Sequence, residues 1–248
     1  CMSDVDEQLW KLGITAKTQH NEVAPCQHEI APIFSVSNVA LDNNYLVMNV
    51  LKKTAKKYGL VCLLHEKPFD GINGSGKHNN WSLTTDDGIN LFKPGKEPEN
   101  NKVFQLVLAC LMSAVDKHAV LLRTAASNTG NDHRLGANEA PPAIISIYLG
   151  DQVGDVVDQI IKTGKATSSL HSGVIDFGIN KLPVLEKDPT DRNRTSPFAF
   201  TGNRFEFRMV ASSNSIGDTN TVLSAMMAEA FADAIDALTG AEDLDKAV

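Results

Sequence analysis

The segment GINGSGKHNNWS, residues 71–82, has the spacing of a phosphate-binding loop: a glycine, four residues, then Gly76 and Lys77. His78 stands where such a loop needs the Ser or Thr that binds magnesium. A phosphate-binding loop must also open into a helix, but residues 79–85, NNWSLTT, are poor helix formers and good strand formers. We therefore interpret the segment as a glycine-rich turn that runs into a strand.

On that strand, His78, Asn80 and Ser82 alternate onto one face, while Asn79 and Trp81 point to the other. The first three side chains could line a binding site. The alternative is a solvated hairpin with an incidental histidine, because a glycine-rich match is weak on its own.

A pair of carboxylates occurs in HNEVAPCQHEIAPIF, residues 20–34, where Glu22 and Glu29 lie on either side of Pro25. The fixed φ and missing N–H of proline suit a turn or an irregular strand. Two carboxylates brought together by such a bend repel each other unless a cation lies between them, and Mg²⁺ and Mn²⁺ prefer oxygen ligands. The pattern indicates either half of a divalent-metal site or two unrelated surface glutamates.

The segment NRFEFR, residues 203–208, alternates strictly. Its two phenylalanines are predicted to face the core, and Arg204, Glu206 and Arg208 share the opposite face. A row of arginine, carboxylate and arginine suits a site that holds phosphate and metal together. The alternative is a salt-bridge ladder on an exposed face.

A fourth polar segment is NDHRLGANEAPP, residues 131–142, which contains Arg134 and Glu139. We expect Gly136 and the two prolines to keep this segment out of a helix. Functional residues concentrate on such loops. The alternative is an ion pair that pins a long loop.

Hydrophobic periodicity indicates the elements that must position these residues. We predict helices over 4–12, 39–58, 103–118, 152–161 and 221–238, with 103–118 as the most buried, and strands over 60–64 and 143–149. In the helix over 152–161, the inward residues are predicted to be Val153, Val156, Val157, Ile160 and Ile161. The polar stretch 182–196 is typical of an exposed loop.

Composition narrows the class of protein. A net charge of −7 with scattered Lys and Arg argues against a nucleic-acid surface and favours a small-molecule substrate. The most apolar stretch, 103–115, is too short to span a bilayer. The four cysteines are far apart and none form a C-x-x-C pair, so we expect reduced thiols in a cytoplasmic protein: Cys1, Cys26, Cys62 and Cys110.

Four segments, taken together and in order, resemble glutamine synthetase, and the type III enzyme most of all. They are HNEVAPCQHEIAPIF, KPFDGINGSGKHNNWS, HRLGANEAPP and NRTSPFAFTGNRFEFR. The resemblance covers residues 17–208, and an ordered series of this kind is far more specific than any one segment. Cys26 stands where the family usually has a glycine.

The resemblance implies a role for individual residues. It implies that the divalent metals, Mg²⁺ or Mn²⁺, are held by Glu22, Glu29, His78 and Glu206. It implies that the substrate glutamate contacts Asn73, Gly74, His78, Arg134 and Arg208, and that ATP contacts Phe34, Asn80, Ser82, Arg194 and Arg204. Arg194 and Glu139 are the implied catalytic residues, with Glu139 accepting a proton from ammonium.

The activity implied by the resemblance is ATP-dependent ligation of ammonia to L-glutamate through γ-glutamyl phosphate, giving glutamine, ADP and phosphate. One alternative is a γ-glutamyl–amine ligase of the same family that uses another amine. The other is a non-catalytic fragment of a ring assembly, because the resemblance implies that the first pair of metal carboxylates lies upstream of Cys1. We therefore expect the isolated fragment to be inactive.

The implied fold is α+β, the glutamine synthetase catalytic domain, with a curved, mostly antiparallel sheet backed by helices. We expect residues 1–248 to form a single partial domain, incomplete at both ends: the N-terminal domain and first catalytic strands are missing upstream, and a C-terminal part is missing downstream. The full-length protein is expected to form a homo-oligomer, a dodecamer of stacked hexameric rings, with no nucleic-acid or membrane partner.

Overall fold

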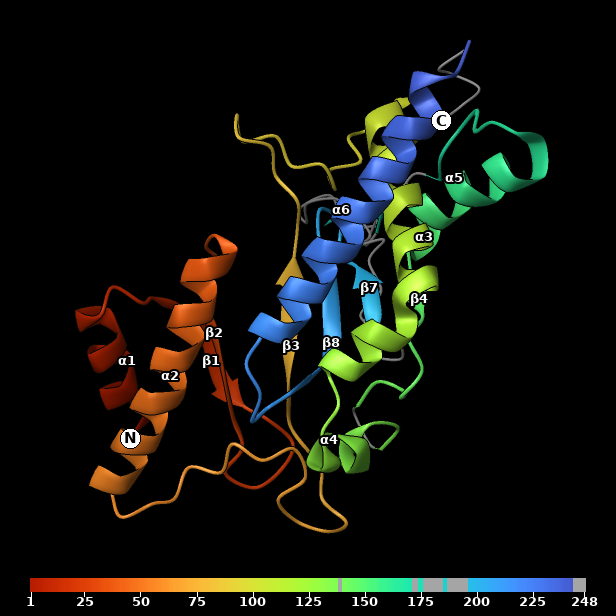
Figure 1. The fold of residues 1–248 in the computed structure, drawn as a ribbon. Helices are drawn as coiled ribbons and strands as arrows, with labels where there is room; N and C mark the ends of the chain where they lie inside the picture. Colours follow the sequence, from red (N-terminus) through yellow and green to blue (C-terminus); the bar gives the residue numbers. More distant parts are fainter. Residues whose placement is uncertain (138–139, 171–173, 176–184, 187–195, 243–248) are drawn as a thin grey trace. The chain divides into compact units, whose positions relative to one another are not determined.

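The computed structural model describes residues 1–137, 140–170, 174–175, 185–186 and 196–242 (Figure 1). The chain divides into two compact units. Unit 1 comprises Cys1–Lys77, Thr124–Ala143 and Met209–Val222, and unit 2 comprises His78–Arg123, Ile144–Arg208 and Leu223–Val248. The single partial domain over residues 1–248 stays a prediction.

The elements follow one another along the chain as helices and short strands. The helices are α1 (Met2–Lys11), α2 (Ser37–Lys57), η1 (Pro98–Asn100, a 3-10 turn), α3 (Lys102–Ala125), α4 (Thr129–Arg134), α5 (Gly150–Thr163) and α6 (Gly217–Thr239). The strands are β1 (Ala16–Asn21), β2 (His28–Pro32), β3 (Gly76–Trp81), β4 (Ile147–Tyr148), β5 (Val174–Ile175), β6 (Leu185–Glu186), β7 (Phe198–Phe200) and β8 (Phe205–Ala211).

In unit 1, α1 packs on α2 through a small apolar cluster that includes Val5, Leu9 and Val47. The periodicity over 4–12 and 39–58 predicted both helices, and both predictions are confirmed. Strands β1 and β2 form an antiparallel hairpin, and the turn predicted around Pro25 lies between them.

The four-stranded sheet, most of whose residues belong to unit 2, has the order β3-β8-β7-β4, with β7 and β8 antiparallel and β4 and β7 parallel. Aromatic side chains form its core: Phe198 contacts Phe205 and Phe207, and Phe92 lies between Trp81 and Phe205. Burying large aromatic rings is one of the strongest contributions to a small core.

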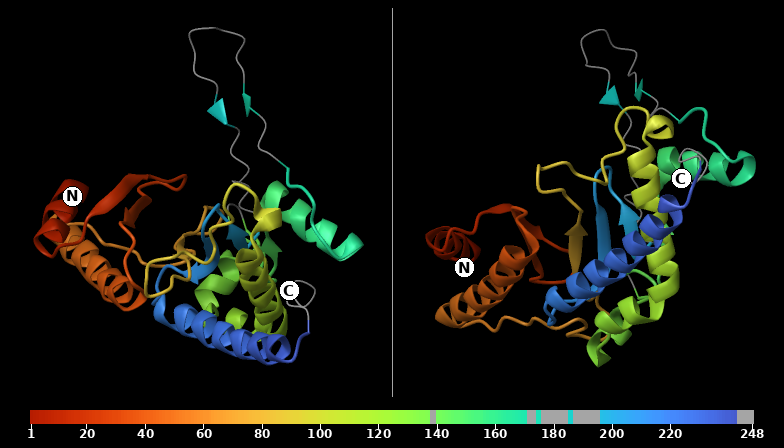
Figure 2. Two further views of the ribbon diagram at one scale, coloured as in Figure 1. Left: turned by 90° about the horizontal axis from the view of Figure 1, so that it is seen from above. Right: turned by 45° about the horizontal axis from the view of Figure 1, so that its top comes forward.

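Helix α3 covers part of this sheet, because Phe104 packs against Phe200 of β7. Helices α3 and α6 lie side by side (Figure 2). The prediction that 103–118 is strongly buried is confirmed, although the helix continues to Ala125 and is kinked at His118. Helix α3 is long and apolar enough to cross a membrane by length and composition, but nine of its residues are buried within the protein, as expected of a core helix.

The strand after the glycine-rich turn is β3, so the rejection of a phosphate-binding loop is confirmed. Asn79 and Trp81 are buried, whereas His78 and Asn80 are exposed, which confirms the predicted alternation. Phe205 and Phe207 are fully buried, as the alternation in NRFEFR predicted. All four cysteines are free, also as predicted.

The predicted strand over 60–64 is wrong. These residues, all of them described, form no strand, and Leu60, Val61 and Leu63 are exposed. An apolar run predicts burial only if another strand pairs with it, and here the chain continues past the end of α2 without such a partner among the described residues. The strand predicted over 143–149 is reduced to β4 for a similar reason, since only Ile147 and Tyr148 pair with β7.

Two further predictions about helices need correction. Residues 131–134 are helical, because the side chain of Asn128 accepts a hydrogen bond from the Asn131 N–H at 2.7 Å and begins α4. The prediction that Gly136 and the two prolines keep the segment out of a helix therefore applies only to the residues after Arg134, where α4 ends. In α5, Val153 and Val156 are buried as predicted, but Ile161 is 74% exposed because it lies in the last turn.

Candidate active site

In unit 2, Glu206 of β8 lies between a histidine and an arginine. Its Oε1 lies 3.3 Å from Nδ1 of His78 on the neighbouring strand β3, and it accepts a hydrogen bond from Nε of Arg208 at 2.7 Å. Alternation fixes this arrangement, because Phe205 and Phe207 turn inward and send Glu206 to the opposite face. The structure thus brings together His78, Glu206 and Arg208, as predicted.

The arginine of this cluster is held rigidly. Its Nη1 donates to the carbonyl oxygen of Ser196 at 3.2 Å, and its backbone N–H donates to Pro197 at 2.8 Å. The Arg208 side chain is almost fully buried, whereas His78 and Glu206 remain partly open to solvent. An imidazole and a carboxylate open on one side suit Mn²⁺ or Mg²⁺.

The predicted ATP-binding residues are partly assembled on the same sheet. Nε of Arg204, the residue just before β8, donates to Oδ1 of Asn80 in β3 at 3.1 Å, at an exposed position. Ser82 follows β3 and is also exposed. A guanidinium held in this way can contact phosphate oxygens.

In unit 1, the hairpin brings a second set of possible ligands together. Nε2 of His20 lies 2.6 Å from Oε1 of Glu22 and 4.0 Å from Oε2 of Glu29. His20 is the register partner of Glu29 across the hairpin, and it shares a face with Glu22 two residues away. One ligand atom from each of the three residues lies within 4.8 Å of the other two.

The sequence reasoning predicted Glu22 and Glu29 as metal ligands but missed His20. The signal was available, because strand alternation places His20 beside Glu22 once a hairpin around Pro25 is assumed. The structure therefore brings together Glu22 and Glu29, with His20 between them.

Arg134, a predicted glutamate-binding residue, ends α4 and is only 4% exposed. Its Nη1 donates to Oδ1 of Asn131 at 3.1 Å. Burial lowers the pKa of the guanidinium to about 10, and the charge of Glu66 opposes this shift, so Arg134 carries a positive charge at neutral pH. The guanidinium lies directly against the glycine-rich turn, because a Cβ added to Gly76 would come within 2.2 Å of its Cζ.

Glu66 is a buried carboxylate that no sequence pattern selected. Glu66 is 2% exposed, and its Oε1 accepts hydrogen bonds from the backbone N–H of Ser213 at 2.9 Å and from Nδ2 of Asn128 at 3.4 Å. Neither partner is near in the sequence, so no local pattern could have found this contact.

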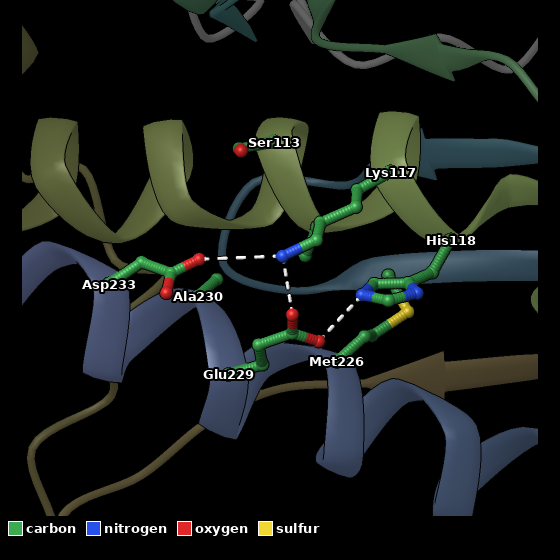
Figure 3. A pocket seen from close by; sticks show the side chains of 8 residues that line it. Ser113, Lys117, His118, Met226, Glu229, Ala230 and Asp233 are labelled. Carbon is green, nitrogen blue, oxygen red and sulfur yellow. Dashed lines mark hydrogen bonds and ion pairs between the residues drawn. The ribbon is translucent and has the colours of Figure 1, made fainter.

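A further ionic cluster lies in unit 2 between α3 and α6 (Figure 3). Glu229 accepts a hydrogen bond from Lys117 through Oε1, and its Oε2 accepts from the ring of His118, whose Nε2 lies 2.7 Å away. Asp233 lies 3.6 Å from Lys117. None of these residues belongs to the predicted site.

Some predicted site residues remain untested. Glu139 and Arg194 lie outside the described residues. Phe34, 92% exposed, belongs to unit 1, so its place beside the nucleotide stays a prediction. The convergence of the hairpin carboxylates of unit 1 with His78 and Glu206 of unit 2 stays a prediction for the same reason.

The comparisons with known proteins agree with this chemistry. Residues 1–146 match the family model described as "Glutamine synthetase, catalytic domain". The chain belongs to the glutamine synthetase family. It is 54% identical to "Type-3 glutamine synthetase" of Dictyostelium discoideum over 231 residues, and this match covers 93% of this chain and 31% of the relative. A glutamine synthetase of Bacteroides fragilis is 50% identical over 229 residues, 92% of this chain and 31% of the relative.

The chain spans about a third of the length of these curated glutamine synthetases. Among solved structures, ligand-free GmaS matches with a TM-score of 0.66 at 17% identity, over 94% of this chain and 44% of that one. A Plasmodium falciparum glutamine synthetase matches with a TM-score of 0.65 at 17% identity, over 94% of this chain and 38% of that one. These matches confirm the predicted α+β glutamine synthetase fold, whose described strand pairs are mostly antiparallel.

The family consists of ligases that are generally dependent on divalent metals, which agrees with the predicted enzyme class. The donor sets fit that dependence, because His20, Glu22 and Glu29 in unit 1, and His78 and Glu206 in unit 2, bring together the carboxylate and imidazole ligands that such ions accept.

Proposed function

We propose that the protein containing this chain ligates ammonia to L-glutamate at the expense of ATP, through γ-glutamyl phosphate, to give glutamine, ADP and phosphate. The observation that carries this proposal is the contact of His78, Glu206 and Arg208 on neighbouring strands, at the positions that the family resemblance assigns. Such a row provides an imidazole and carboxylate for a cation beside a guanidinium for an anion.

Glu22, Glu29, His78 and Glu206 would hold Mg²⁺ or Mn²⁺. When bound, these ions supply positive charge that neutralises the phosphates of ATP and the developing charge of phosphoryl transfer. The mixed carboxylate and imidazole donors suit Mn²⁺ at least as well as Mg²⁺.

The protein residues bind and orient the anionic substrates. Arg204, fixed by Asn80, would contact the ATP phosphates. Arg134 and Arg208, both buried and fixed, would bind the carboxylates of glutamate, beside Asn73 and Gly74. Phosphoryl transfer brings several anions together, so guanidinium groups that are already in place lower its barrier without a protein nucleophile.

The second step needs a proton acceptor. Ammonium must lose a proton before the nitrogen can attack γ-glutamyl phosphate, and a carboxylate such as Glu139 is suited to accept it. Phe34 and Ser82 would line the adenosine part of ATP, and Arg194 would assist at its phosphates. We also propose a cytoplasmic location, with which the free thiols agree, and a homo-oligomer of stacked hexameric rings.

The proposal is tested by measuring glutamine formation with glutamate, ATP and ammonia, in the protein containing this chain. Glu206→Ala should abolish metal-dependent turnover, whereas Glu229→Ala, which removes an exposed carboxylate elsewhere in unit 2, should leave it unchanged. Near-normal turnover of Glu206→Ala would refute the proposed site. Comparison of ammonia with ethylamine as acceptor separates glutamine synthesis from ligation of another amine.

A further inference from the structure

Glu66 joins three segments of unit 1 that are distant in the sequence. Besides the Ser213 backbone N–H and Asn128, its Oε1 also accepts from the Ser213 hydroxyl. Burial raises the pKa of this carboxyl, but the hydrogen bonds together outweigh burial, and the pKa lies below its ordinary value. Glu66 is therefore an ionised carboxylate in the interior of the unit.

The first connection from Glu66 to Arg134 runs through the start of α4. Asn128 donates to Glu66 through Nδ2 while its Oδ1 accepts from the Asn131 backbone N–H at 2.7 Å. Asn131 in turn accepts from Nη1 of Arg134 at 3.1 Å. The same Asn131 donates to the carbonyls of Ala126 and Met209, so it has little freedom to move.

The second connection runs through the glycine-rich turn. The carbonyl oxygen of Glu66 accepts the Ser75 N–H at 2.9 Å. A Cβ added to Gly74 would lie 2.2 Å from that carbonyl oxygen and 3.3 Å from Cγ of Arg134. The turn is thus enclosed between the Glu66 backbone and the Arg134 side chain, and no larger residue fits without displacing one of them.

Charge provides the third connection. Burial lowers the pKa of Arg134 to about 10 and the pKa of Lys77 to about 8, and in both cases the negative charge of Glu66 opposes the shift. Arg134 is buried and Lys77 is partly buried, and cations withdrawn from water need a nearby anion, because an uncompensated buried charge is costly.

From these contacts we infer that Glu66 is a positioning residue, which fixes the Arg134 guanidinium against the glycine-rich turn for binding of the substrate carboxylate. Glu66 does not itself touch substrate. The inference rests on the proposed function for what Arg134 binds, but the placement of Arg134 by Glu66 can be measured without turnover.

Glu66→Gln is the most informative variant, because glutamine keeps the size and can still accept from Ser213 but lacks the charge. We expect the KM for glutamate to rise about tenfold, with kcat and the KM for ATP nearly unchanged, since a small displacement of a substrate-positioning group is costly. Glu229→Gln is the matched control, because it removes the charge of a hydrogen-bonded glutamate in the other unit. Asn128→Ala should raise the KM for glutamate in the same way, because Asn128 connects Glu66 to Asn131 and Arg134 of α4.

A second readout does not depend on activity. In ¹H–¹⁵N NMR spectra of the chain, the Arg134 Nε–H signal, assigned with Arg134→Lys, should exchange with solvent about tenfold faster in Glu66→Gln than in the wild type, because buried, fixed groups are protected. The same comparison with Asn128→Ala covers the case in which Glu66→Gln fails to fold.

The two readouts separate the possible failures. The inference would be overturned if the exchange rate of the Arg134 Nε–H and the KM for glutamate both stay at wild-type values in Glu66→Gln and Asn128→Ala, and only the melting temperature falls. Glu66 would then be a structural residue. Absence of glutamine formation in the wild type would refute the proposed function, and the exchange rate of Arg134 would then decide the positioning role alone.

Discussion

Two glutamates of this protein make several polar contacts each, yet their surroundings are opposite. Glu66 is 2% exposed and is held by neutral donors from Ser213 and Asn128. The Glu229 side chain is 44% exposed and is held by Lys117 and His118, which carry or can carry positive charge. Contacts with Lys117 and then His118 lower the pKa of Glu229, whereas the pKa of Glu66 is lowered by donor groups despite burial.

This difference teaches where a carboxylate can fix the position of other groups. An exposed ion pair is weakened by water and salt and can rearrange at little cost. A buried carboxylate cannot lose a donor without leaving that donor unsatisfied. The contacts of Glu66 therefore determine the local structure around Arg134, whereas those of Glu229 only adjust the contact between α3 and α6.

The largest effect is expected for Glu66→Ala. This change leaves the Ser213 N–H and hydroxyl and the Asn128 amide without their acceptor, and it removes the anion near Arg134 and Lys77. We expect the free energy of unfolding, measured with urea, to fall by about 3 kcal/mol. An effect no larger than that of Glu229→Ala would show that burial does not distinguish the two sites.

A smaller effect is expected from acid. The pKa of Glu66 in the folded protein lies below 4.5, the ordinary value that applies to the unfolded chain. Its contribution to the free energy of unfolding is therefore complete above pH 4.5 and is lost as the pH falls through the folded-state pKa. Glu66→Gln should flatten this part of the pH profile, measured by urea unfolding, and an unchanged slope would contradict the assignment.

The smallest effect is expected for Glu229→Gln. Because Glu229, Lys117 and Asp233 lie at the surface, the variant should be slightly less stable at low salt and equal to the wild type at about 1 M salt, where charges are screened within a few ångströms. Thermal unfolding at both salt concentrations provides the measurement. A loss of thermal stability in Glu229→Gln that persists at high salt would mean that the cluster of Glu229, Lys117 and Asp233 is structurally as important as Glu66.

The sequence predicted those features that depend on local periodicity. Alternation placed Phe205 and Phe207 in the core and Glu206 on the opposite face, and helical spacing located α1, α2, α3 and α6. The family resemblance then selected His78 as the partner of Glu206, and the two side chains are in contact.

Features that depend on distant partners could not be predicted in this way. Residues 60–64 have the composition of a strand, but they form one only if another strand pairs with them, and their own sequence does not show whether such a strand is present. Glu66 stands in a segment with no motif of its own, and only the fold brings Ser213 and Asn128 to it. Local signals do not carry the identity of such partners.

The central claim, that Glu206 and His78 form part of a divalent-metal site of a glutamine synthetase, is tested most directly by titrating the protein with Mn²⁺ and following free Mn²⁺ by EPR. The account predicts that Glu206→Ala weakens Mn²⁺ binding by about tenfold or more, while Glu229→Ala binds like the wild type. Equal Mn²⁺ affinity of the wild type and Glu206→Ala would contradict it.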